Sequence, residues 1–168
     1  MVKKYNAHVS AFDFSREAIN LAHESFGSPN IHFSVRGMDE NFPEENNSVD
    51  LVLDIMASFS LSDFDRKKYI SEINRVLKPG GLMYLRTLAK EGDKNAAYLI
   101  KNNPGPEADT YIHPTLGSSE RVFSEKVLRE QYSPFFEILF IEKKSGYQKF
   151  NNQSYKRNYW NVYLQKKA

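Results

Sequence analysis

Residues 73–85, INRVLKPGGLMYL, carry the clearest signal of fold class in this chain of 168 residues. The first part continues an apolar stripe at helical spacing, so we expect a helix over residues 63–77. The triplet Pro79-Gly80-Gly81 ends that helix, because neither residue type continues helical backbone well. The apolar run that follows predicts a buried strand over residues 82–88.

Upstream, strand and helix alternate in the same way. We expect strands over residues 7–12, 31–35 and 49–55, the last of which, VDLVLDI, is typical of a buried parallel strand. Ser15 stands at the N-cap position of a helix between the first two strands. This order predicts an α/β fold, with a mostly parallel sheet, right-handed crossovers and helices on both faces.

Downstream, residues 89–122 are rich in proline and glycine, and we expect an irregular insert, either a lid or a mobile segment. Ser124 is predicted to cap a short helix that ends at Tyr132. Strands over residues 136–144 and 158–166, joined by a polar connector, predict an antiparallel hairpin. No domain boundary is evident, so we expect one domain over residues 1–168.

Composition narrows the classes of function. Hydrophobic residues make up 40% of the chain and charged residues 26%, as in globular proteins. No apolar run approaches the roughly 18 residues of a membrane helix, and no secretory leader is recognisable, so we expect no membrane partner. The chain has no cysteine, which excludes disulfides and thiolate ligands and makes a cytoplasmic location the default expectation. The histidines lack metal-ligand spacing, so no metal is expected.

Three segments, in order, resemble the class I S-adenosylmethionine-dependent methyltransferases: AFDFS (11–15), GMDENFPEENNSVDLVL (37–53) and the helix, turn and strand of residues 73–85. The resemblance extends over about residues 3–167. It implies a Rossmann-like sheet, S-adenosylmethionine as cofactor, and methyl transfer to an acceptor, most readily a small molecule. The insert over residues 89–122 would cover that acceptor.

One part of the family pattern has no counterpart in this sequence. No G-x-G motif occurs, and no strand is predicted before Ala7, so we expect the N-terminal strand and its glycine-rich turn to be missing. Residues 1–5 are similar to the tail of the helix that follows that turn. The chain could be a truncated form, a partner could supply the strand, or the flanking strands could pair directly. Unpaired inner edges would favour self-association.

The resemblance also indicates cofactor-binding residues. Asp13 is placed at the carboxyl end of a parallel strand, where ligands of open α/β sheets bind. With Phe14 beside it, Asp13 would accept hydrogen bonds from the ribose hydroxyl groups. The adenine would be contacted by the bend after the second strand, through Met38, Asp39 and Glu40. Met38 stands where the family usually has an acid, and Asp39 follows one position later.

After the strand over residues 49–55, Ile55 and Met56 would line the floor beneath the methyl group. Ser58 and Phe59 are the nearest candidates for contact with the acceptor. Asp54 is expected to accept a hydrogen bond from a neighbouring N–H group rather than to react. His113, in the insert, is a lesser candidate for a general base, and no residue is assigned as catalytic.

Residues 143–168 contain seven Lys or Arg and no Asp or Glu, interleaved with aromatic residues. This pattern suits nucleic acid, but an edge hairpin protected from aggregation by its charges is the favoured interpretation, since the net charge of the chain is only +2. Two other functions stay open. A non-catalytic scaffold or subunit agrees with the missing glycine turn, and a nicotinamide-dependent oxidoreductase would need that turn.

Overall fold

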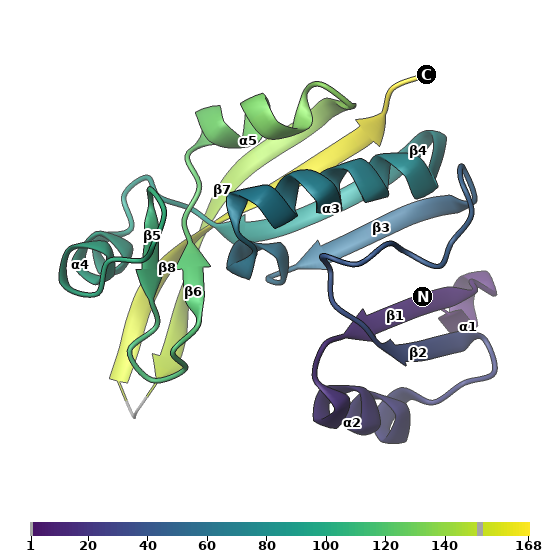
Figure 1. Cartoon of the computed structure of the whole chain (residues 1–168), viewed down its shortest axis with the longest axis horizontal. Helices are drawn as coiled ribbons and strands as arrows, with labels where there is room; N and C mark the ends of the chain where they lie inside the picture. Colours follow the sequence, from purple (N-terminus) through teal and green to yellow (C-terminus); the bar gives the residue numbers. More distant parts are fainter. Residues whose placement is uncertain (1, 151–152) are drawn as a thin grey trace. The chain divides into compact units, whose positions relative to one another are not determined.

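A computed structural model describes residues 2–150 and 153–168 of the chain (Figure 1). The chain divides into two compact units, Met1–Asn41 and Phe42–Ala168. The single domain expected over residues 1–168 stays a prediction, and the two units are described separately below.

The first unit is a β-α-β arrangement. Its elements are α1 (Val2–Tyr5), β1 (Val9–Asp13), α2 (Arg16–Phe26) and β2 (Ile31–Val35). The two strands are parallel, with Val9 opposite Ile31 and Asp13 opposite Val35. The Ser15 hydroxyl accepts the backbone N–H of Ala18 at 3.2 Å and caps α2, which confirms the predicted N-cap.

The second unit is built on a four-stranded sheet in the order β3-β4-β8-β7. Its strands are β3 (Val49–Ile55), β4 (Leu77–Leu88), β7 (Phe136–Phe150) and β8 (Gln153–Lys166). β3 and β4 are parallel, whereas β8 is antiparallel to both neighbours, so the predicted C-terminal hairpin is confirmed. The helices α3 (Asp63–Val76) and α5 (Glu125–Tyr132) lie on one side of this sheet (Figure 1), and η1 (Ser58–Ser60) follows β3.

Between α3 and the sheet lies an apolar core. Ile73 on the helix and Leu85 and Val162 on the strands are each at most 1% exposed. The mixed α/β class expected from the sequence is thus confirmed.

The start of β4 differs from the prediction of residues 82–88. Val49 pairs with Leu77, and the next matched pair is Leu51 with Leu82, so the register shifts there. The residues between Leu77 and Leu82 form an excursion within the paired strand, where Gly80 has a φ of 75°. Glycine adopts this left-handed conformation without the steric cost that a Cβ brings. The helix therefore continues directly into a paired strand.

The prediction of an irregular insert over residues 89–122 is wrong. This segment forms α4 (Lys94–Asn102) and a small antiparallel hairpin of β5 (Thr110–Ile112) and β6 (Ser119–Arg121). Asp93 caps α4 by accepting the Ala96 N–H at 2.8 Å. Buried apolar residues then hold the insert in place, namely Leu88, Ala96, Leu99, Tyr111, Val122 and Tyr159.

The hairpin is also longer than predicted. Pairing of β7 with β8 extends from Phe136–Lys166 to Phe150–Gln153, so residues 145–150 and 153–157 of the predicted polar connector are strand, and its paired Asn residues at 151–152 lie outside the described residues. Its polar residues do not prevent pairing, because backbone groups alone make the ladder hydrogen bonds.

One face of the four-stranded sheet is open. Leu51, Leu53 and Ile55 of β3 are 38%, 50% and 54% exposed, although the sequence predicts a strand buried on both faces. Leu51 and Leu53, with Leu82 of β4, Tyr163 of β8 and other apolar neighbours, line a shallow hollow of about 420 Å³. Within residues 2–150 and 153–168, β3 pairs only with β4, and β1 pairs only with β2. We call the surface formed by Leu51, Leu53, Ile55, Leu82, Phe140 and Tyr163 the open face.

Candidate functional site

Asp13 and the bend over residues 37–40 meet at the same end of the β1–β2 pair. Asp13 is the last residue of β1 and lies opposite Val35, the last residue of β2. The backbone N–H of Arg36 donates to the Asp13 carbonyl oxygen at 2.9 Å, so the bend starts directly beside Asp13. Parallel pairing therefore brings together two candidate cofactor segments that are more than twenty residues apart in the sequence.

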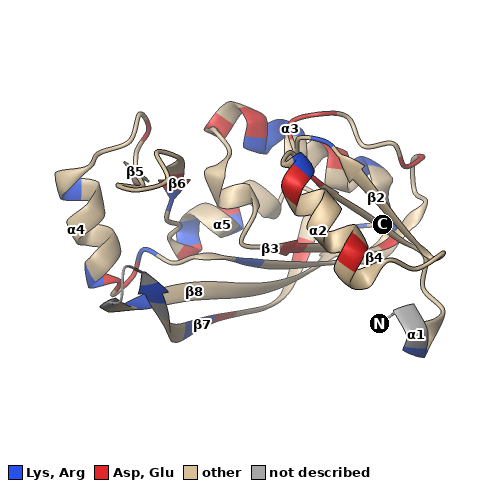
Figure 2. Ribbon diagram, turned by 90° about the horizontal axis from the view of Figure 1, so that it is seen from below, with Lys and Arg blue, Asp and Glu red and all other residues tan. Residues whose placement is uncertain are grey.

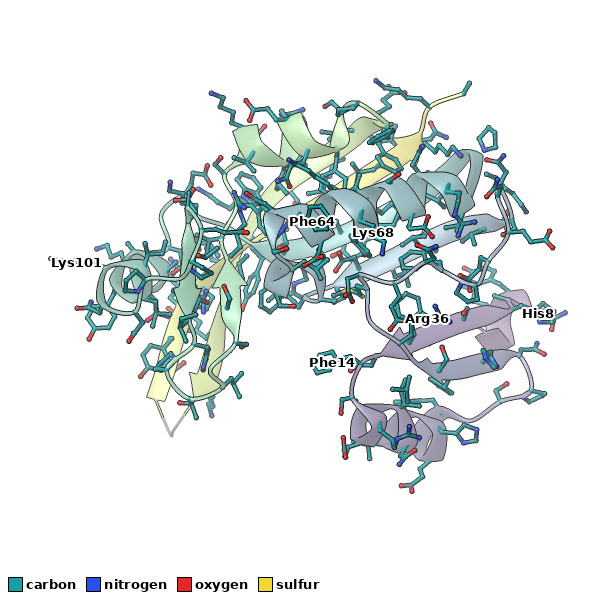
Figure 3. The ribbon with its side chains drawn as sticks, viewed as in Figure 1. His8, Phe14, Arg36, Phe64, Lys68 and Lys101 are labelled. Carbon is teal, nitrogen blue, oxygen red and sulfur yellow. The ribbon has the colours of Figure 1, made fainter. Side chains whose placement is uncertain are left out.

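One oxygen of the Asp13 carboxylate accepts a hydrogen bond from the protein, and the residue is exposed. Oδ1 accepts the backbone N–H of Ser15 at 2.8 Å, which fixes the orientation of the side chain at the start of α2. Within the described part of the chain, no hydrogen bond to Oδ2 is found, and the residue is exposed. Phe14, next to it, is 80% exposed and extends away from the ribbon (Figure 3).

The bend is a compact turn held by Glu40. Glu40 Oε1 accepts the Gly37 N–H at 2.8 Å, and its other oxygen lies 3.6 Å from the Arg36 guanidinium. Glu40 is thus engaged within the bend, whereas Asp39 is exposed and Met38 is half-buried. A Cβ on residue 37 would overlap the Asp39 carboxylate, so the exposed Asp39 side chain would have to move if residue 37 were not glycine.

Ile55 and Met56 belong to the second unit, at the carboxyl end of β3. Met56 has a φ of 60°, a conformation that non-glycine residues adopt at a cost. Its N–H donates to the Arg86 carbonyl oxygen at 2.8 Å and so keeps β3 tied to β4 at this point. Backbone held in a sparsely populated conformation is found more often at ligand sites than elsewhere.

Asp54 organises the turn after β3. It is 2% exposed; Oδ1 accepts the N–H groups of Ala57 and Ser58 at 3.3 Å, and Oδ2 accepts the Tyr69 hydroxyl at 3.0 Å. This agrees with the expected structural role. Burial raises the pKa of Asp54, although its hydrogen bonds act in the opposite direction. Burial also raises the pKa of Tyr69, which therefore stays a hydroxyl donor.

Sequence reasoning missed Tyr69 as the partner of Asp54. The available signal was a lone acid inside an apolar strand, which needs a donor, and a tyrosine on the buried stripe of the next helix. Helix spacing identified Tyr69 only as a core residue.

The remaining candidates have local structural roles. Ser58 is 2% exposed, and Phe59 packs against the apolar cluster of the insert, so both are part of the protein interior or its edge. His113 Nδ1 accepts the N–H groups of Thr115 and Leu116 at 3.3 and 3.2 Å, which orders the turn between β5 and β6. This use of the ring nitrogen does not favour a general base at His113.

The basic residues near the C-terminus are largely paired within the protein, although Figure 2 shows several of them toward the turn end of β7 and β8. Arg157 contacts Asp93 at 3.1 Å, Lys144 contacts Glu142 at 2.7 Å, and Lys166 donates to the Leu77 carbonyl oxygen at 2.8 Å. The aromatic residues Tyr159 and Trp160 are buried. Base stacking would need the rings of Tyr159 and Trp160 at the surface.

Across 2–150 and 153–168, no group of three or more His, Asp or Glu residues is close enough to hold a metal ion. Over the same residues, no helix combines the length and apolarity that a membrane crossing requires.

Comparison with known proteins adds sequence and fold relatives. Residues 1–81 match the family described as Methyltransferase domain. The chain is 32% identical over 123 residues to phthiotriol/phenolphthiotriol dimycocerosates methyltransferase 1 of Mycobacterium ulcerans, which covers 73% of this chain and 41% of that protein. The chain thus spans about two fifths of the length of this relative.

Solved structures share the fold. A SAM-dependent methyltransferase from Methanosarcina mazei aligns over 94% of this chain and 81% of its own, with a TM-score of 0.77 and 21% identity. The 1,6-didemethyltoxoflavin-N1-methyltransferase of Burkholderia thailandensis, solved with S-adenosylhomocysteine, aligns over 99% of this chain and 64% of its own, with a TM-score of 0.65 and 15% identity. The predicted resemblance is therefore confirmed in fold.

Proposed function

We propose that this chain, which has the fold of the class I S-adenosylmethionine-dependent methyltransferases and matches the methyltransferase-domain family over residues 1–81, binds S-adenosylmethionine and serves transfer of its methyl group to a small-molecule acceptor. The observation that carries the proposal is that Asp13, at the end of β1, lies next to the start of the 37–40 bend. The chain spans about two fifths of the length of the Mycobacterium ulcerans relative. Its activity is therefore proposed from the residues of this chain and is not taken over from that protein.

In this proposal the nucleoside is held by the first unit. Asp13 accepts hydrogen bonds from the ribose hydroxyl groups, and its fixed orientation through Ser15 lowers the entropy lost on binding. Asp39 accepts from the exocyclic amine of the adenine and Met38 covers the ring, while Glu40 and Gly37 keep the bend in shape. The accessible carboxylates at one strand end fit a neutral, polyhydroxylated nucleoside.

Methyl transfer from S-adenosylmethionine needs few catalytic side chains. S-adenosylmethionine supplies a sulfonium-activated methyl group, so the protein mainly aligns the acceptor and excludes water. We assign the floor of this region to Ile55 and Met56. Asp54 keeps the turn after β3 in position through Ala57, Ser58 and Tyr69 and holds no proton that the reaction needs.

Titration calorimetry of the chain with S-adenosylhomocysteine, with NAD as the matched control, tests the proposal. We expect saturable binding of S-adenosylhomocysteine and no heat from NAD. Binding of NAD alone would favour the oxidoreductase. Absence of binding by this chain and by a form extended at the N-terminus would favour the scaffold, whereas binding by the extended form alone would indicate truncation.

The scaffold alternative has one specific observation in its favour. The open face and the unpaired edge of β3, as far as the described residues go, expose apolar side chains that a partner or a second copy could cover. We therefore propose self-association, or a partner that supplies the missing strand, as a property of this chain under either function.

A small molecule is the favoured acceptor, because the pairing of Arg157, Lys144 and Lys166 within the protein opposes a nucleic-acid groove. The cytoplasmic location also stays a proposal, which rests on the sequence and which fractionation of the source cells tests.

A further inference from the structure

A pocket of about 250 Å³ lies within the second unit, between α4, the turn after β5 and the first part of β8. It contains none of the candidate cofactor residues. Its lining includes Asn95, Tyr98, Leu99, Asn103, His113 and Arg157. This volume is slightly below the range that is usual for small-molecule sites, about 300–1,000 Å³. A volume of this size suits a ligand of about one or two fused rings.

The charge of the pocket is compensated from within the protein. Arg157 is 4% exposed; its Nε donates to Asp93 Oδ2 at 3.1 Å and its Nη2 to the Tyr111 hydroxyl oxygen at 3.0 Å. Tyr111 in turn donates to Glu120 Oε2 at 2.5 Å. One buried guanidinium thus faces two buried carboxylates in a single hydrogen-bonded network. Such a network provides no net positive charge for an anionic ligand.

The walls favour a flat ring with polar substituents. Tyr98, 62% exposed, stands at the rim, and Leu99, 9% exposed, forms part of the floor. Aromatic walls pack well against a ring face. The side-chain amides of Asn95 and Asn103 can each donate and accept hydrogen bonds, so they suit a hydroxyl or carbonyl group.

The pocket and Met56, which is assigned to the floor beneath the methyl group, share one apolar cluster. Leu99 belongs to the same buried apolar cluster as Leu88 and Tyr111, and Met56 and Phe59 pack against that cluster. A ligand that contacts Leu99 would therefore contact the apolar cluster against which Met56 and Phe59, in the turn after β3, also pack.

We propose that this pocket binds an uncharged aromatic ring bearing a hydroxyl or carbonyl group, and that this ring is part of the methyl acceptor. The identification with the acceptor rests on the proposed function, whereas the binding itself does not. Two tyrosines line the pocket, Tyr98 and the half-buried Tyr155, and Tyr98, the exposed one, is the specificity-determining residue in this proposal.

Titration calorimetry of the full chain with 1-naphthol, and with 1-naphthoate as the anionic counterpart, tests the proposal. We expect 1-naphthol to bind at least tenfold more tightly than 1-naphthoate, and Tyr98→Ala to weaken 1-naphthol binding at least fivefold. Tyr147→Ala, which removes a tyrosine that is 76% exposed elsewhere, should leave the affinity within twofold. Leu53→Asn on the open face should do the same.

The proposal is overturned if 1-naphthol does not bind, if 1-naphthoate binds as tightly, or if Leu53→Asn weakens binding as much as Tyr98→Ala, since the ring would then occupy the open face. S-adenosylhomocysteine is titrated in parallel. Loss of its binding with retained 1-naphthol binding contradicts only the proposed function, and the reverse result contradicts only the pocket.

Discussion

Asp13 and Asp54 both lie near the carboxyl ends of parallel strands, yet their surroundings separate their roles. Asp13 is exposed and its carboxylate has a single hydrogen bond, to Ser15, from within the described chain. Asp54 is buried and accepts three hydrogen bonds from the protein. A carboxylate that must bind a ligand needs oxygen atoms that the ligand can reach, and Asp13 is exposed whereas Asp54 is 2% exposed. Burial, rather than residue type, distinguishes the binding acid from the structural one.

Asp13→Ala should weaken binding of S-adenosylhomocysteine at least tenfold, since hydrogen bonds to a charged group contribute about 1.5–3 kcal/mol. Titration calorimetry measures the change. Glu24→Ala removes an exposed carboxylate from α2 in the same unit and should leave the affinity within twofold. Equal loss in both variants would mean that net charge, and not the position of Asp13, governs binding.

Asp54 should make stability depend on pH. Because burial raises its pKa, the folded chain binds this proton more tightly than the unfolded chain does. The stabilising contribution is present below the unfolded-state pKa of about 3.9 and is lost as pH rises through the higher folded-state pKa. Between pH 4 and 7, the free energy of unfolding of the wild type should therefore fall relative to that of Asp54→Asn. Urea unfolding at several pH values measures this, and parallel curves would contradict it.

Removal of the whole side chain should have a larger effect. Asp54→Ala leaves the N–H groups of Ala57 and Ser58 and the Tyr69 hydroxyl without their acceptor. Each buried donor left unpaired costs about 1–3 kcal/mol. Tyr69→Phe, which removes one of the three hydrogen bonds, should destabilise the chain less than Asp54→Ala in the same urea experiment. An equal or larger loss in Tyr69→Phe would show that the turn does not depend on Asp54.

At the level of elements, the sequence predicted those segments whose local signals agree with their packing. β2 and β3 have the predicted bounds because a short apolar run flanked by polar residues leaves little choice of register. The insert was misjudged because its prolines and glycines lie between elements and obscured the helical spacing of Ala96 and Leu99. The start of β4 was missed because pairing of Leu77 with Val49 is a tertiary contact.

The excursion between Leu77 and Leu82, at the start of β4, tests whether this strand needs a left-handed glycine at Gly80. Gly80→Ala places a Cβ at a φ of 75°, which costs about 1–2 kcal/mol for a non-glycine residue. Gly146→Ala is the matched control, because its added Cβ would meet its nearest neighbour, Tyr159, at an ordinary 3.5 Å. Thermal unfolding should show a lower Tm for Gly80→Ala and little change for Gly146→Ala. A similar loss in both variants would point to strand propensity instead of backbone conformation.

For the whole molecule, the open face is the feature that sequence alone did not predict. The apolar run over residues 49–55 predicts a strand whose two faces are both buried. In the described structure, Leu51, Leu53 and Ile55 on one face of that strand are exposed. Whether a strand is covered depends on chain elements distant in sequence, so no local pattern reveals it. The pairing of Asp13 with the 37–40 bend could be predicted, because the strand order β-α-β places those ends together.

Self-association should follow from the open face, since apolar patches of this kind are interaction surfaces. We expect concentration-dependent association in sedimentation equilibrium, and Leu53→Asn should weaken it at least tenfold. Leu116→Asn, at a position that is 68% exposed in the β5–β6 turn, should leave it unchanged. A wild-type chain that sediments as a monomer at all concentrations would show that the face is covered in solution.

The most direct test of the central claim is a ¹⁵N NMR titration of the chain with S-adenosylhomocysteine. If the strand end formed by Asp13 and the 37–40 bend holds the adenosyl group, the largest amide shifts occur at Asp13, Ser15, Gly37 and Asp39. Shifts confined to residues 42–168, or the absence of saturable shifts at these four amides when binding is detected by calorimetry, would contradict it.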